Sequence, residues 1–544
     1  MTMREALMAA AVGLPLLMLL LCASAPLRRR LPAWFAIAPL PALAAAVCAS
    51  PSEMLRFGNS RFALRFALDT SGALLLGTAA LLWLFAGIFA TRVLRDRERI
   101  DGFVVCWFMA MTGCVGVFLA ADLIGFYLML AVLSVGASGL VLQGDGPDAR
   151  YAGALYLGIA LLAEAFLLGG LILLAQATPG GSLLIRDAAA ALPDSPWRDT
   201  TLLLLLIGLA IKAGLVPLHF WMPYAYGAAP TPAAAVLSGA VVKASVIALV
   251  RFLPFGNAWP HFGIPLATLG MFGAFYGVAI GITQSQPKIV LAYSSVSQMG
   301  FLVAVIGMGL AAGDPATVVA AAYYAAHHLL VKGTLFLAVG VVALTGAGKL
   351  RWVQVPTAVI ALGLGGLPLT GGALAKYAAK DLLGGDLAGS LAVASSVATT
   401  LLMLHFLRCL GAIAVAHSDA RAPAPLTGAW LAMVLASLIV PWVLYLNIPI
   451  GTLPEALMPA ALWSAFWPVL AGAVLAIGWT RWSRAMPSVP AGDVGHLLHG
   501  LQRGGVTVAR IAVCGDAFVR RWSVSCLTLL LAALLFGALL AVVG

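Results

Sequence analysis

Apolar runs, each close to the ~20 residues that a helix needs to cross a bilayer, alternate with short polar segments along this chain of 544 residues. The pattern predicts an all-α polytopic membrane protein with about 16 transmembrane helices (about 14–16). We number these predicted spans 1 to 16 in chain order. They cover residues 5–26, 31–50, 70–91, 102–120, 122–142, 151–176, 200–216, 231–253, 262–282, 287–310, 315–345, 356–375, 388–416, 427–447, 459–479 and 522–543.

Composition leads to the same class. Only 9% of the residues are charged, whereas 62% are hydrophobic. A soluble protein of this size needs a surface with roughly a quarter of its residues charged, so the outer surface of this chain must face lipid. The first apolar run has one basic residue before it, Arg4, and its basic cluster, residues 28–30, after it. A cleavable signal peptide has its positive charge before the run, so we expect span 1 to be a transmembrane helix.

The net charge of +11 is unevenly distributed over the loops. Most Lys and Arg residues outside the spans fall in loops that follow odd-numbered spans. The positive-inside rule places such loops in the cytoplasm. We therefore expect a multi-pass protein of the cell inner (plasma) membrane, with odd-numbered loops cytoplasmic and both termini outside. The charge is explained by topology, so we expect no nucleic acid partner.

Several titratable side chains stand in or beside the apolar runs. A charge near the middle of a membrane costs at least ~3 kcal/mol on the insertion scale, and such residues usually face a protein interior or a water-filled path. The alternative is a purely structural role, since a buried lysine can bond a carbonyl and a buried histidine can pack against its neighbours. We expect an ion route instead. Its candidate groups are Glu164, Lys212, Lys243, His328, Lys332 and Lys376, with His219, His327 and Asp381 as accessory residues.

Proline and glycine interrupt the helical pattern at residues 212–236 and 363–381. Irregular backbone at membrane depth is tolerated only where protein or a wet cavity surrounds it. Paired interruptions in two halves of a transporter mark its ion site. Here spans 7 and 12 are interrupted, which predicts two inverted five-helix repeats, residues 102–253 (helices 4–8) and 262–416 (helices 9–13).

The remaining segments flank these repeats. Residues 1–101 are expected to form helices 1–3, and residues 427–544 the C-terminal helices. Within the latter, residues 481–521 interleave apolar and basic positions, which suits an interfacial connector. A solvated linker is the alternative.

The motifs at these positions resemble the antiporter-like subunits of complex I, membrane-bound hydrogenases and multisubunit (Mrp-type) cation/proton antiporters. The best match is KAGLVPLHFWMPYAYGAAPTPAAAV (212–236) with the helix that follows it. Further matches, in the same order as in the family, are FALRFALDTSGALLL, QSQPKIVLAYSSVSQMGFL, HHLLVKGTLFLAVG and GLPLTGGALAK. The resemblance covers roughly residues 60–420.

The resemblance implies roles for the lysines. Lys212 would hold a proton at the broken seventh helix, and Lys243 would stand at the inner end of the first half-channel. Lys332, with His328 one turn earlier on the same helix face, would continue a central polar axis. Lys376 would be the group of the second half.

The chain departs from the family on the fifth helix. The usual glutamate that pairs with the seventh-helix lysine is replaced by Ala131. Glu164, on span 6, is the carboxylate well inside a span of the first half, and we expect it to pair with Lys212. The alternative is an impaired first half in a largely structural subunit. Tyr224, Tyr226 and Gln298 also replace residues that are titratable in many relatives.

The leading hypothesis is a proton-translocating subunit of a multisubunit membrane complex, either a complex I-like (NADH:quinone) oxidoreductase or a related hydrogenase. One alternative is a subunit of an Na+/H+ antiporter or of an ion-coupled inorganic carbon uptake system. Another is a quinone-reducing subunit. We expect no cofactor or metal, because the seven cysteines have no ligand spacing and no nucleotide, flavin or haem motif is present. The driving reaction would then lie in partner membrane subunits.

Overall fold

The computed structural model describes residues 2–48, 53–58, 63–95, 100–415, 420–482, 489–490 and 492–493. Within these residues, 12 helical segments are long and apolar enough to cross a membrane. The chain is a multi-pass, mainly helical membrane protein, as predicted. The segments are α1 (Met3–Leu21), α4 (Thr70–Leu94), α5 (Asp101–Leu119), α6 (Leu123–Leu142), α7 (Ala149–Ala177), the composite Thr231–Phe252, α13 (Pro260–Gly281), α14 (Pro287–Ala312), α15 (Ala316–Val342), α18 (Leu387–Ala412), α19 (Ala424–Asn447) and α21 (Pro459–Trp482).

Two further spans are divided, at the places the sequence predicts. Span 7 consists of α9 (Arg198–Ala213) and α10 (Trp221–Ala228), and span 12 of α16 (Leu350–Gly365) and α17 (Gly371–Leu383). The composite span 8 is also irregular. It joins α11 (Thr231–Val236) to α12 (Lys243–Phe252) through a π-helical turn, η4 (Leu237–Val241).

Span 2 differs from the single helix expected over residues 31–50. It consists of a 3-10 turn, η1 (Leu31–Trp34), and the eight-residue helix α3 (Leu40–Val47). Prolines 32, 39 and 41 explain the difference, because each lacks an N–H and restricts the preceding residue. The segment still crosses the molecule. Arg4 pairs with Glu53 at one end of α1, and Arg28 pairs with Asp101 at the other.

The expectation of an all-α chain missed a small hairpin. Strands β1 (Met54–Gly58) and β2 (Ala63–Ala67) pair antiparallel before α4. The remaining short elements are α2 (Ala25–Arg28), η2 (Pro179–Gly181), α8 (Ile185–Ala191), η3 (Leu192–Asp194), η5 (Ala347–Lys349) and α20 (Leu453–Leu457). The predicted span 16 and most of the predicted connector lie outside the described residues, so the total of sixteen spans stays a prediction.

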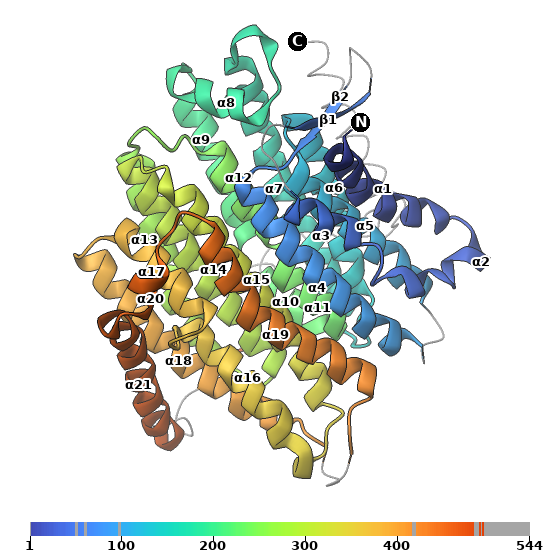
Figure 1. Ribbon diagram of the computed structural model, residues 1–544, viewed down its shortest axis with the longest axis vertical. Coiled ribbons are helices and arrows are strands. Elements are labelled where there is room, and N and C mark those ends of the chain that lie inside the picture. Colours follow the sequence, from blue (N-terminus) through green and yellow to red (C-terminus); the bar gives the residue numbers. More distant parts are fainter. Residues whose placement is uncertain are drawn as a thin grey trace, which may run out of the picture.

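The spans run side by side in one bundle, with the N-terminal helices on one side and α21 on the other (Figure 1). Helix α15 is at the centre, where it packs against α4, α11, α14, α16, α17 and α19. Its residues are buried along almost the whole length. The polar side chains of α15 are therefore enclosed by protein rather than lipid.

Glycines bring α13 and α14 into close contact. A Cβ atom on Gly270 would lie 2.6 Å from the Gly300 oxygen, and one on Gly263 would lie 2.5 Å from the Gly307 oxygen. Small residues at helix interfaces allow such close approach in membranes. Helix α14 of this pair packs against α10 of the first broken span and against α17 of the second.

Arg251, at the end of α12, joins three spans at the face that bears the even-numbered loops. Its guanidinium bonds both oxygens of Asp69, the N-cap of α4, and three carbonyl oxygens at the end of α5. Burial raises the pKa of Asp69, but the Arg251 charge and hydrogen bonds outweigh it, so the pKa lies below its ordinary value. The carboxylate therefore stays charged, and it holds α4, α5 and α12 together.

Candidate functional site

The first break lies between α9 and α10. Helix α9 ends at Gly214, which adopts a left-handed conformation with φ of 70°. The Leu215 N–H bonds the Ala210 oxygen at 2.9 Å, the six-to-one bond of a Schellman ending. Lys212 stands in the last turn of α9. A basic residue in the last turn is favoured by the negative end of the helix dipole.

Lys212 forms a buried ion pair with Glu164 of α7. The Nζ atom lies 2.6 Å from Glu164 Oε1, and the side chains are 11% and 2% exposed. Ser134 of α6 accepts from Lys212 and donates to the same carboxylate oxygen. The other oxygen of Glu164 is buried without a hydrogen-bond partner among the described residues. The structure thus brings together the two residues expected to pair, with a serine as the third member.

A small cavity of about 20 Å³ continues from this pair toward span 8. Lys212, Ser134, Tyr156 and Tyr226 line it, together with Ser245 of α12. Its volume is sufficient for one water molecule. The π-helical turn η4 directly precedes Lys243, and such turns often occur at functional sites.

Lys243 is completely buried, and its Nζ atom lies 3.8 Å from the Met299 sulfur of α14. Lys332 of α15 is equally buried. It donates to the Leu291 oxygen at 2.8 Å and to the Ser294 hydroxyl at 2.7 Å. Both lysines therefore point at α14 and have neutral partners. Neither forms a salt bridge within the described part of the chain.

The histidines of α15 are adjacent and buried. Neither ring of His327 or His328 has a hydrogen-bond partner among the described residues. His327 packs against the start of α17, since a Cβ atom on Gly371 would lie 2.6 Å from its Nδ1. Gln298, where many relatives have histidine, joins two helices instead. It accepts from Tyr324 at 2.8 Å and donates to Thr399 at 3.1 Å.

The second break, between α16 and α17, has the same backbone ending as the first. Gly366 is left-handed with φ of 101°, and the Leu367 N–H bonds the Leu362 oxygen at 3.2 Å. Lys376 approaches this ending from α17. Its Nζ donates to the Gly365 oxygen at 2.8 Å and to the Ser396 hydroxyl at 2.6 Å. Both broken spans thus place an ammonium at the carbonyl end of their first helix.

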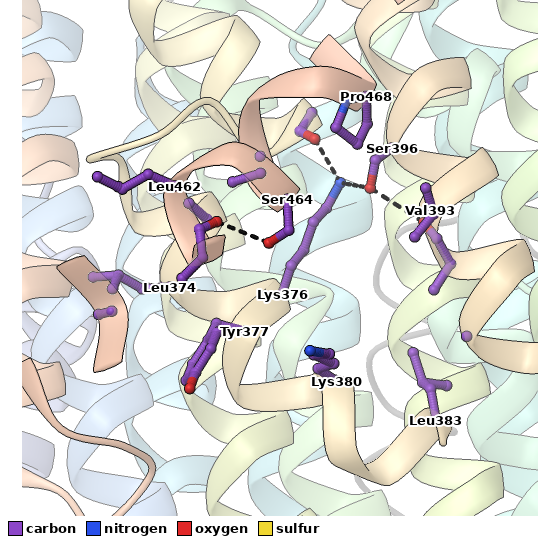
Figure 2. A pocket seen from close by; sticks show the side chains of 18 of the residues that line it. Leu374, Lys376, Tyr377, Lys380, Leu383, Val393, Ser396, Leu462, Ser464 and Pro468 are labelled. Atoms are coloured by element: carbon purple, nitrogen blue, oxygen red, sulfur yellow. Dashed lines mark hydrogen bonds between the residues drawn. The ribbon is translucent and has the colours of Figure 1, made fainter. Parts of the chain in front are cut away.

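Lys376 lies beside a cavity of about 360 Å³ between α17, α18 and α21. Figure 2 shows its side chain directed towards Ser396, with Lys380 one turn further along α17. The lining includes Gly384 and Gly385, in the link from α17 to α18, and Gly389 in the first turn of α18. This cavity therefore extends to the face of the even-numbered loops. Asp381 is exposed at that end of α17 and does not take part in the buried series.

A second, larger cavity of about 1100 Å³ lies at the opposite face. Its lining comes from loops after spans 5, 7, 9 and 11, and we call it the odd-loop vestibule. The polar and aromatic residues of its wall are Phe89, Asp145, Asp148, Tyr151, Tyr224, Thr231, Gln286 and Lys288.

His219 belongs to the first break and is fully buried. It packs against Tyr276 of α13 and Tyr293 of α14, with ring centroids 5.1 and 6.1 Å away. Its Nε2 also lies 3.4 Å from an oxygen of Asp493, although the direction is not that of a hydrogen bond. Sequence reasoning missed Asp493 and the serines 134, 294 and 396. The serines carry no motif, whereas Asp493 stands out as an acid within an arginine-containing connector.

The described residues contain no cluster of three metal-binding side chains. The geometry is that of a series of buried cations, one paired with an acid, between two cavities that open to opposite faces. Groups of this kind can accept and release a charge one after another, because each charge changes the energy of the next.

Known proteins resemble the chain in sequence. The family described as NADH:quinone oxidoreductase/Mrp antiporter, TM, matches residues 120–404. An N subunit of NADH-quinone oxidoreductase, from Desulforudis audaxviator, is 33% identical over 287 residues, 51% of this chain and 56% of that protein. A Na(+)/H(+) antiporter protein of the D type, from Alkalihalophilus pseudofirmus, is 26% identical over 343 residues, 60% of this chain and 68% of that protein. The match thus spans little more than half the length of the first relative.

Solved structures resemble it in fold. The Mrp complex from Dietzia sp. DQ12-45-1b contains a chain that superposes with a TM-score of 0.73 at 21% identity, over 94% of this chain and 60% of that one. A chain of the membrane-bound sulfane sulfur reductase, an archaeal respiratory membrane complex, gives a TM-score of 0.69 at 17% identity, over 86% and 99%.

Proposed function

The chain belongs to the NADH:quinone oxidoreductase/Mrp antiporter transmembrane family, and from that premise we propose that it translocates protons as a subunit of a multisubunit membrane complex. The buried Lys212–Glu164 pair, in the bend of a broken span, is the observation that carries the proposal. A charge pair at this depth is costly to keep, and such residues mark ion pathways in membranes.

The proposed route runs from the odd-loop vestibule to the cavity beside Lys376. Protons pass the pair of Lys212 and Glu164, then Lys243, then His328 and Lys332, and leave by Lys376. The first steps are supported by the one-water cavity between Lys212 and span 8. The last step is supported by the position of Lys376 at the opposite cavity.

Two inverted repeats, residues 102–253 and 262–416, are part of this proposal. The repeats are supported by the Schellman ending that both breaks share and by the lysine that stands at each break. Residues 1–101 and 427–544 then flank the repeats. Arginine-rich odd-numbered loops favour a cytoplasmic vestibule in the inner membrane, with both termini outside. Other membrane subunits would supply the driving reaction.

Exchange of Na+ for protons is a second candidate. The Gly365 carbonyl that binds Lys376 is the kind of oxygen ligand that half-helix ends offer to sodium, and the Ser396 hydroxyl of α18 adds a second oxygen beside it. His327 and His219 would be accessory groups in either case.

The test uses the assembly purified with the full chain and reconstituted in liposomes. Proton uptake is recorded with an internal pH dye, driven by an imposed potassium potential or by a sodium gradient. We expect Glu164→Gln and Lys212→Met to lose most of the flux. A sodium-driven flux without a potential-driven one would favour the antiporter candidate. Wild-type flux no greater than that of empty liposomes under both gradients would overturn the proposal.

A further inference from the structure

A buried acid from beyond α21 meets the first broken span. Asp493 lies after the fifteenth span, yet its side chain is only 7% exposed and reaches His219 in the link between α9 and α10. Tyr276 of α13 donates to its other oxygen. The contact between Asp493 and His219 therefore links the C-terminal part of the chain to the broken span that also contains Lys212.

Anchoring alone does not explain a carboxylate here. Two neutral hydrogen bonds already hold this segment. The Gln284 amide donates to the Val489 oxygen at 2.9 Å, and the Gly492 N–H donates to the Tyr293 hydroxyl at 3.1 Å. A buried carboxylate costs far more free energy than such neutral contacts. Its presence beside a histidine points to exchange of a proton.

The vestibule supplies the access that exchange requires. Tyr224 lines the odd-loop vestibule, and its ring stands edge-on to Tyr151 at 5.4 Å. On its other side Tyr224 packs on the connector, so closely that a Cβ atom on Gly492 would overlap the ring. A single aromatic side chain thus stands between the vestibule and the residue next to Asp493.

We propose that Asp493 and His219 form the proton-loading pair of the first half, between the odd-loop vestibule and Lys212. This inference rests on the proposed function. A proton from the vestibule binds the Asp493 carboxylate or the neutral His219 imidazole, and the same proton later leaves toward the break. No bond other than those to the proton forms or breaks. Because the pair is buried, a change in its charge is little screened and can act on the Lys212–Glu164 pair of the same broken span.

The test compares proton flux in the reconstituted assembly. Asp493→Asn and His219→Gln should each lower the flux by roughly 100-fold, the scale of a lost proton-transfer group. Asp493→Glu should restore most of it. The double variant Asp493→Asn/His219→Gln should be no slower than either single one, because the two residues act as a unit. Asp199→Asn is the matched control and should keep wild-type flux, since this acid is 69% exposed and its one salt bridge among the described residues is with its neighbour Arg198.

Gln284→Leu distinguishes a role in proton loading from a role in holding the connector in place. It removes the hydrogen bond to the Val489 oxygen and keeps the Asp493 carboxylate. If Gln284→Leu lowers flux and thermal stability as much as Asp493→Asn does, the pair is an anchor and the inference is wrong. Wild-type flux in Asp493→Asn together with lost flux in Glu164→Gln would overturn the inference but leave the proposed function standing. Wild-type flux in both variants would overturn both.

Discussion

The two broken spans share a backbone and differ in charge. Each ends its first helix at a left-handed glycine, Gly214 or Gly366, and each has a lysine at this ending. Lys212 stands in the last turn of α9, whereas Lys376 reaches the ending of α16 from α17. At the first break the lysine has a carboxylate partner, Glu164, at 2.6 Å. At the second, the hydrogen-bond partners of Lys376 among the described residues are a carbonyl and a hydroxyl. A helix ending of this kind favours a nearby cation. Whether a counter-charge balances that cation depends on the side chains of the neighbouring helices.

This difference assigns different tasks to the two halves of the proposed route. An ion pair in low dielectric holds both charges firmly, so the first break changes state only when a neighbouring charge weakens the pair. Lys376 has no such counter-charge among the described residues, and it lies beside a cavity of about 360 Å³, whereas the cavity beside Lys212 has only about 20 Å³. Its proton can therefore leave more readily. The first half would gate the proton, and the second would release it.

Removing the acid of the first break should have the largest effect. Glu164→Gln leaves Lys212 as a buried cation without a counter-charge, which costs about 3–5 kcal/mol of stability. We expect most of the proton flux to be lost and the thermal midpoint in detergent to fall. Wild-type flux in this variant would remove the first break from the mechanism.

A relocated acid provides the matched rescue. Ala131 lies one turn before Ser134 on α6 and packs against Leu157 of α7. In the double variant Glu164→Ala/Ala131→Glu, the carboxylate moves from α7 to α6, one turn from Ser134. We expect flux and stability to return in part, because the pair needs an acid near Lys212 rather than a particular helix. Failure of the rescue, with the chain folded, would show that α7 itself is required.

Removing the cation of the second break should affect flux but not stability. Lys376→Met takes away an ammonium that has no counter-charge among the described residues, and it leaves a side chain of similar length. Since burying such a charge is costly, we expect the thermal midpoint to stay equal or rise while proton flux is lost. Lys212→Met is the comparison, and it should lower the midpoint because it leaves Glu164 buried and unpaired. Equal shifts in the two variants would contradict the difference between the breaks.

An acid added to the second break should make it resemble the first. Ser396 lies 2.6 Å from Lys376, so Ser396→Asp would create an ion pair there. We expect slower flux, because the paired ammonium gives up its proton less readily. Ser396→Asn, which is similar in size and neutral, is the control and should retain more of the flux. Faster flux in the aspartate variant would mean that loading rather than release limits this half.

The sequence predicted the breaks well and their chemistry only in part. Proline, glycine and lysine within apolar runs mark residues 212–236 and 363–381, because these residue types are costly at membrane depth. The absence of an acid at Ala131 pointed to Glu164, which was the available carboxylate of that half. The serines at positions 134, 294 and 396 were not predictable, since a serine on a membrane helix usually bonds its own backbone.

Asp493 shows a different limit. Its contact with His219 joins segments 274 positions apart in a chain of 544 residues, and no periodicity within either segment encodes that distance. The hairpin β1–β2 was missed for a local reason. Its strands have only five residues each, and so short an alternating pattern is easily lost between long apolar runs.

We expect the smallest effect from substitution of the two left-handed glycines that end the first helices of the broken spans. Alanine at a left-handed glycine costs about 1–2 kcal/mol, so Gly366→Ala should lower the thermal midpoint modestly. Its new Cβ would lie 3.2 Å from Lys376 Cδ, a flexible side chain that can move. At Gly214 the Cβ would instead overlap Met222 Cε, inside a fully buried contact. We therefore expect Gly214→Ala to lower the midpoint more, although the backbone conformations match. Equal midpoints would mean that strain in the left-handed turn, rather than packing around it, sets the stability of both breaks.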